Sequence, residues 1–161
     1  MLSFAYTLRY HRFAFDPLAG TLLVALPLLL TWGTDTGAML FGKAFGVRKL
    51  MPTVSPKKTV VGAVAGAAVS VALSALYVRY ALAPYARLTM PLAASLAFGF
   101  LVSVAGQVGD LVESMLKRQA GIKDSSALIP GHGGALDRVD SLLFTLPVAY
   151  VLLDLLLVPA A

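Results

Sequence analysis

Three polar side chains near the middle of the chain have the spacing of one shared site. Asp110, Ser114 and Lys117 are separated by four and then three residues, so a helix presents them on one face. Glu113 lies beside them. A carboxylate next to an apolar run is costly, and at membrane depth it is a functional candidate by default. The alternative is a helix-end acid that reaches water and pairs with Arg118, or with Lys117 through Glu113.

A glycine-rich stretch, 130–140, follows this helix face. Its glycines flank His132, and their bare backbone N–H groups can approach an anion closely. Asp137, Arg138 and Asp140 then begin a predicted helix, whose N-terminus favours an anionic ligand. Asp137 could instead be an ordinary first-turn acid or cap, and His132 a loop histidine without a chemical role.

The donor types indicate which ligands such a segment could hold. Carboxylates, one nearby histidine and no cysteine anywhere in the chain fit a hard cation such as Mg²⁺. A metal flanked by Lys and Arg is the arrangement that handles nucleotide phosphates. The chain has no GxxxxGK[ST] loop and no kinase motif set, so neither standard nucleotide-binding solution applies.

The composition is typical of an integral membrane protein rather than a soluble one. The chain has 161 residues, of which 58% are hydrophobic and only 13% charged, and we expect a single domain, 1–161. Its net charge of +5 comes from basic residues in loops between apolar spans. That distribution disfavours nucleic-acid binding and favours membrane topology and a phosphate-rich ligand.

The apolar stretches predict an all-α, polytopic membrane protein with about four transmembrane helices. Residues 1–17 are expected to form an interfacial lead-in. The expected spans are about 18–34, 60–82, 90–112 and 139–158. The third span is expected to continue as a helix through Gln119. Gly62 and Gly66 form a GxxxG motif, which allows close helix packing.

The lysine and arginine counts predict the orientation of the chain. Segments 35–59 and 113–138 carry nine of these residues and the opposite side carries four, which places both segments in the cytoplasm as catalytic loops. Asp35 is expected to end the first span. Gly37, Gly42 and Gly46, together with Lys43, are expected to form a phosphate-binding turn. For Ser55 to Lys58 the alternative is plain positive-inside charge.

Several of these motifs, taken in order, resemble one known family. They are Asp35-Thr36-Gly-Ala, Ser55-Pro56-Lys57-Lys58-Thr59, Ser114-Met-Leu-Lys117-Arg118, Lys123-Asp124, Ile129-Pro130-Gly-His132-Gly133-Gly134 and Asp137-Arg138-Val-Asp140. Together they closely resemble the signature of the phosphatidate cytidylyltransferases, also called CDP-diacylglycerol synthases. Val61 and Ala135 depart from the family pattern, which has an acid and a larger aliphatic residue there. Family members are usually longer, so the chain resembles their C-terminal catalytic part.

The resemblance implies a Mg²⁺-dependent reaction in which CTP and phosphatidate give CDP-diacylglycerol and pyrophosphate. It implies that Asp110 and Asp137 hold the metal. Phosphate contacts are implied for Ser114, Lys117, Arg118 and Lys123, and binding of a CTP or lipid phosphate for Ser55, Lys57 and Lys58. The nucleotide-binding group also includes Asp124, His132, Gly133, Gly134 and Arg138. Asp35, Asp124 and Asp140 are the acids for which a supporting or structural role is the alternative.

The expected setting is the bacterial inner membrane, with membrane lipid, CTP and phosphatidate or a similar lipid phosphate as partners, no nucleic acid, and a homodimer as the assembly. Two other functions remain open from the sequence. One is a related CTP-dependent membrane enzyme that acts on another lipid. The other is a truncated, inactive homologue that serves as a structural membrane protein.

Overall fold

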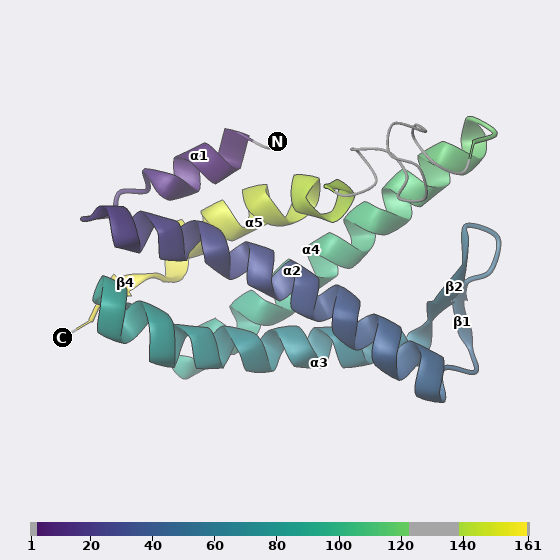
Figure 1. Ribbon diagram of the computed structural model, residues 1–161, viewed down its shortest axis with the longest axis horizontal. Coiled ribbons are helices and arrows are strands. Elements are labelled where there is room, and N and C mark those ends of the chain that lie inside the picture. Colours follow the sequence, from purple (N-terminus) through teal and green to yellow (C-terminus); the bar gives the residue numbers. More distant parts are fainter. Residues whose placement is uncertain (1–2, 123–138, 161) are drawn as a thin grey trace.

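The computed structural model describes residues 3–122 and 139–160, and most of them are helical, as expected. The elements in order are α1 (Ser3–Arg9), α2 (Pro17–Phe45), β1 (Lys49–Met51), β2 (Ser55–Thr59), α3 (Val60–Tyr77), the π-helical segment η1 (Val78–Ala86), β3 (Leu88–Thr89), α4 (Leu92–Gln119), α5 (Asp140–Leu156) and β4 (Val158–Pro159). In Figure 1 the β1–β2 hairpin lies at one end of the molecule, and α1 and β4 lie at the other.

Three helical segments of the described chain are long and apolar enough to cross a membrane. They are α2, α3 continued through η1, and α4. At 17 residues α5 is shorter than these, and it occupies most of the expected fourth span. The polytopic all-α architecture is therefore confirmed, whereas the number of four crossings stays a prediction. The expected helical continuation of the third span through Gln119 is also confirmed.

Helix α2 differs from the expectation at its C-terminal end. It continues without a break through Asp35 to Phe45, so the first part of the expected loop 35–59 is helical. The expectation that Gly37, Gly42 and Lys43 form part of a phosphate-binding turn was therefore wrong, because all three lie inside α2. Both glycines lie inside α2, where they let α3 approach: a Cβ on Gly37 would lie 2.9 Å from a methyl of Val69.

The predicted GxxxG motif of α3 is confirmed as a packing surface. A Cβ on Gly62 would lie 2.6 Å from the backbone oxygen of Ala38, and a Cβ on Gly66 would lie 2.6 Å from that of Thr34. Side chains of this size cannot fit there, so the glycines bring the backbones of α2 and α3 together. This close packing places the start of α3 beside the C-terminal half of α2.

Buried hydroxyl groups form hydrogen bonds between the helices and so fix which residues face each other. Ser70 and Ser74 of α3 donate to the backbone oxygens of Gly99 and Ser95 in α4, at 2.8 and 2.7 Å. Thr34 of α2 bonds Ser103 of α4 at 3.1 Å. In a bilayer such hydrogen bonds stabilise helix association because hydrocarbon offers the groups no partner.

The apolar core lies toward the end of the molecule away from the hairpin. Its fully buried members include Leu8, Leu23, Leu26, Leu30, Leu82, Leu88, Phe98, Leu146 and Leu153. The N-terminal segment belongs to this core. Arg12 fastens it to α5, because its Nε lies 2.8 Å from Asp154 Oδ1 and its Nη2 donates to the Asp154 carbonyl at 2.6 Å.

Candidate active site

A cavity of about 680 Å³ lies where the hairpin meets three helices. Its walls come from the C-terminal half of α2, the hairpin, the start of α3 and the middle of α4. The lining residues with polar or charged side chains are Asp35, Lys43, Lys49, Lys57, Lys58, Thr59, Gln107 and Asp110. The other lining residues are apolar or glycine. A ligand in the cavity would therefore contact both charged and apolar groups, which suits a lipid headgroup or a phosphate ester.

The hairpin is held in place by Thr59, its last residue. Thr59 is buried, and its hydroxyl caps α3 by accepting a hydrogen bond from the Gly62 N–H at 3.1 Å. A Cβ on Gly42 would lie 2.9 Å from the same hydroxyl, so α2 packs directly on this cap. Val61, which replaces the acid of the family pattern, lies in the first turn of α3. The cap supplied by Thr59 therefore anchors the hairpin without a carboxylate there.

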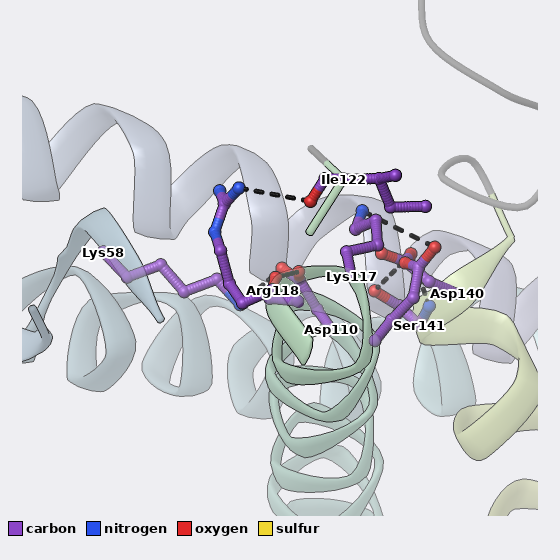
Figure 2. Close-up of polar contacts among 9 residues, drawn as sticks. Lys58, Asp110, Lys117, Arg118, Ile122, Asp140 and Ser141 are labelled. Atoms are coloured by element: carbon purple, nitrogen blue, oxygen red, sulfur yellow. Dashed lines mark hydrogen bonds and ion pairs between the residues drawn. The ribbon is translucent and has the colours of Figure 1, made fainter. Parts of the chain in front are cut away.

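The central contact of the cavity is an ion pair between the hairpin and α4. Lys58 Nζ lies 2.5 Å from Asp110 Oδ2, and both side chains are about two-thirds to three-quarters buried. The other oxygen of Asp110 accepts a hydrogen bond from Ser114 at 3.4 Å, one turn further along α4. Figure 2 shows Lys58 approaching from the hairpin toward the helix that carries Asp110. The hairpin and α4, which are distant in the sequence, therefore meet at one site, as expected, through Lys58 and Asp110.

Asp35 brings a second carboxylate to the same cavity from the α2 side. Its charge interacts with those of Asp110, Asp140 and Lys58. Asp140 begins α5, where its Oδ1 accepts a hydrogen bond from the backbone N–H of Ser141 at 2.6 Å. Carboxylates from three different helices therefore lie near one another, Asp35 and Asp110 in the cavity lining and Asp140 outside it.

Gln107 lies one turn before Asp110 on α4, and its amide can be oriented from its partners. The carbonyl oxygen of Ala63 only accepts hydrogen bonds, so the group 3.2 Å from it must be the Nε2 of Gln107. The same Nε2 donates to Ser103 Oγ at 3.1 Å. Both N–H bonds are committed, and the amide oxygen remains as an acceptor on a residue that lines the cavity.

The basic residues at the end of α4 take different positions. Lys117 Nζ lies 3.5 Å from Glu113 Oε1 on the same helix. The Nε of Arg118 lies 3.5 Å from the backbone oxygen of Val54 in the hairpin turn, and its Nη1 lies 3.5 Å from that of Ile122 (Figure 2). The described residues that line the cavity do not include Lys117, Arg118 or Ser55.

Several predicted residues lie outside the described residues. They are Lys123, Asp124, His132, Gly133, Gly134, Asp137 and Arg138. The predicted pairing of Asp110 with Asp137 at a metal therefore stays a prediction. Within residues 3–122 and 139–160, no three acidic or histidine side chains come together as a ready metal cluster. The described oxygen donors of the cavity lining include the carboxylates of Asp35 and Asp110 and the amide oxygen of Gln107, which are ligands that a hard cation prefers.

Sequence reasoning did not select Gln107, Thr59 or Lys49 as ligand-binding residues. Lys43 was expected near phosphate, but in a turn rather than in a helix, and Lys49 was counted only for topology. Thr59 and Gln107 carried a usable signal, because Thr59 precedes an apolar helix as a cap residue does and Gln107 precedes Asp110 by almost one turn. The positions of both lysines in the wall depend on the continuation of α2 and on the hairpin register.

Comparison with known proteins shows the family of this chain. Residues 1–156 match the cytidylyltransferase family. The chain is 45% identical over 127 residues to the phosphatidate cytidylyltransferase of Bacillus subtilis (strain 168), which covers 79% of this chain and 45% of that protein. It is 41% identical over 144 residues to the phosphatidate cytidylyltransferase of Haemophilus influenzae (strain ATCC 51907 / DSM 11121 / KW20 / Rd), with 87% and 48% covered.

A third relative, the phosphatidate cytidylyltransferase of Staphylococcus aureus (strain COL), is 46% identical over 125 residues, which cover 78% of this chain and 46% of that protein. The chain therefore belongs to the cytidylyltransferase family, as the motifs of the sequence indicated. It spans about half the length of the curated relatives it matches.

Proposed function

We propose that this chain transfers the cytidylyl group of CTP to phosphatidate, giving CDP-diacylglycerol and pyrophosphate. The observation that carries the proposal is the cavity in which Lys58 and Asp110 meet at the junction of the membrane helices and the hairpin. Its charged and apolar lining suits one substrate that stays in the bilayer and one that comes from water. Membership of the cytidylyltransferase family supports the same reaction.

The reaction needs positioning and charge neutralisation more than a covalent nucleophile. An oxygen of the lipid phosphate attacks the α-phosphorus of CTP, a new P–O bond forms, and the bond to the β-phosphate oxygen breaks to release pyrophosphate. Negative charge builds on the leaving group, and lysines beside the cavity can stabilise it. Lys57 and Lys58 are the residues of the wall that we assign to this role, with Ser114, Lys117, Arg118 and Lys123 as further phosphate contacts.

Mg²⁺ is the proposed cofactor because the cavity lining offers carboxylate oxygens, which a hard cation prefers. Asp110 and Asp137 are the residues that would hold it, and Asp35 and Asp140 add negative charge nearby. When bound, the ion supplies neutralisation of the phosphate oxygens. Lys58 already compensates one oxygen of Asp110, so a bound Mg²⁺ would share this carboxylate with the hairpin.

The proposed setting follows from the two substrates. Phosphatidate remains in the membrane and CTP is soluble, so the reacting groups meet at an interface. We assign that interface to the cytoplasmic face of the bacterial inner membrane, because segments 35–59 and 113–138 carry most of the lysines and arginines. A homodimer is the proposed assembly.

The test is a direct assay of the purified chain in detergent with labelled CTP, phosphatidate and Mg²⁺. We expect CDP-diacylglycerol and pyrophosphate in equal amounts, no product with EDTA, and a rate lowered by about a hundredfold or more in Asp110→Asn. Product with a polyprenyl phosphate but not with phosphatidate would assign another lipid substrate. Absence of product with every lipid phosphate, from a folded chain, would indicate an inactive homologue.

A further inference from the structure

One face of α2 forms a charged wall of the cavity. Asp35, Met39 and Lys43 recur at intervals of four residues, and all three line the cavity. Eight residues of helix place the Cα atoms of Asp35 and Lys43 roughly 12 Å apart along α2. The cavity therefore has an acid toward the middle of α2 and a cation at the end of the same helix.

Lys49 joins this outer end of the cavity from the hairpin. It pairs with Thr59 in the β1–β2 ladder, and Thr59 is the buried cap that fixes the hairpin to α3. The backbone that carries Lys49 is therefore anchored, although its ammonium group is exposed. Lys43 and Lys49 come from two separate elements, and both line the cavity.

The charges of the described wall do not balance. Four lysines line the cavity (Lys43, Lys49, Lys57 and Lys58) against two aspartates, Asp35 and Asp110, and Asp110 is already paired with Lys58. No acidic side chain within residues 3–122 and 139–160 forms an ion pair with Lys43 or Lys49. Unbalanced cations that face a cavity attract an anionic ligand.

We propose that Lys43 and Lys49 form a second phosphate-binding position in this cavity, apart from the Lys58–Asp110 pair. This inference rests on the proposed function, because that reaction brings two phosphate-bearing molecules into one cavity. The phosphate belongs either to the lipid acceptor or to the nucleotide. The competing explanation is that Lys43 only stabilises the C-terminal end of α2 and that Lys49 only adds positive charge at the membrane surface.

Binding, rather than turnover, separates these explanations. The whole chain is purified in detergent, and dissociation constants are measured for three probes: CTP, a short-chain soluble phosphatidate, and inorganic pyrophosphate. The variants are Lys43→Gln, Lys49→Gln and the charge-preserving Lys43→Arg. Arg48→Gln is the matched control, because Arg48 is exposed, neighbours Lys49 and does not line the cavity. Circular dichroism and thermal unfolding establish that every variant is folded.

We expect Lys43→Gln and Lys49→Gln each to weaken binding of at least one probe by roughly five- to tenfold, which is about the effect of one lost charged contact. Arg48→Gln should change binding by less than about twofold, as a rim charge in salt does, and Lys43→Arg should restore most of the affinity. Weakened CTP and pyrophosphate binding assigns the position to the nucleotide, and weakened phosphatidate binding assigns it to the lipid.

Unchanged affinity for all three probes in both glutamine variants would overturn the inference, and so would an equal loss in Arg48→Gln. A parent chain that binds none of the probes overturns it as well. A parent chain that binds the probes with the expected lysine dependence but transfers no cytidylyl group leaves this position in place and removes the proposed function.

Discussion

Lys58 Nζ lies 2.5 Å from Asp110 Oδ2, so the hairpin and α4 meet through a lysine and a carboxylate. The sequence offered Lys117 and Arg118 as partners for this acid, because they follow it on the same helix. The observed partner instead comes from a different element. The contact therefore does two things: it fastens the hairpin over the cavity and it places a cation beside the acid proposed to hold Mg²⁺.

Removing either member of this pair should abolish most activity without unfolding the chain. We expect Asp110→Asn and Lys58→Met each to lower kcat/KM by about a hundredfold or more, since positioned charges in a phosphoryl-type reaction have effects of this size. The double variant should lose little more than the worse single one, because the two groups act as a unit. Arg79→Gln, in η1 and so at the end of this span away from the cavity, is the control. Near-normal activity of Lys58→Met would remove the hairpin lysine from the mechanism.

Substitution of Gln107 should test the assigned orientation of its amide. Gln107→Glu keeps the shape, but a carboxylate cannot donate to the Ala63 carbonyl, so we expect a loss of about 1–3 kcal/mol in unfolding free energy. Gln107→Leu also loses both hydrogen bonds, yet it buries no charge and should cost less. The measurement is unfolding by denaturant in detergent. A glutamate variant as stable as the parent would show that the amide does not donate to Ala63.

The glycine contacts between α2 and α3 predict a sharp steric effect. A methyl group on Gly66 would lie 2.6 Å from the backbone oxygen of Thr34, which cannot rotate away. We expect Gly66→Ala to destabilise the chain by about 1–3 kcal/mol, as overpacking does. Ala68→Val adds more volume at an exposed position of the same helix and should be nearly neutral. Equal stability of Gly66→Ala and the parent would contradict the close packing.

His11 should make stability depend on pH at the end of the molecule away from the cavity. Burial lowers the pKa of His11 below its ordinary value of 6.5, and the charge of Arg12 lowers it further, against the opposing effect of Asp154. Well above pH 6.5 the imidazole of His11 is neutral in both the folded and the unfolded state, so the stability that neutral His11 allows is then complete. It decreases as the pH falls through 6.5 toward the lower folded pKa, because only the unfolded imidazole then takes up a proton.

The measurement is the unfolding temperature of the parent and of His11→Phe from about pH 5 to about pH 8, the range in which histidine titrates. The parent should lose stability on acidification more steeply than the variant. His132 is present in both proteins, so the difference between the two curves isolates His11. Parallel curves would show that the burial of His11 does not affect proton binding.

The parts of the fold that depend on local pattern were predictable. The extension of α4 to Gln119 follows from a continuous helical pattern without proline, and the GxxxG of α3 was correctly interpreted as packing. The same reasoning failed at Gly37 and Gly42. A glycine that allows a turn and a glycine that allows close helix contact both lack a Cβ, and one sequence does not distinguish them.

The candidate site was predictable in its residue types and only partly in its pairings. Asp110 and Lys58 were both selected from motifs, but their mutual contact depends on how the hairpin lies over α4. Likewise, the amide of Gln107 gains its role only through Ala63 of another helix. Contacts of this kind are set by the packing of elements distant in sequence, and no local pattern encodes them.

One consequence concerns the membrane itself. Strand β2 ends at Thr59 and α3 begins at Val60, so no flexible residues separate Lys58 from a membrane-spanning helix. A helix that tilts to match a thinner bilayer carries the hairpin with it, whereas Asp110 follows the tilt of α4. We therefore expect the separation of Lys58 and Asp110 to change with the thickness of the surrounding lipid.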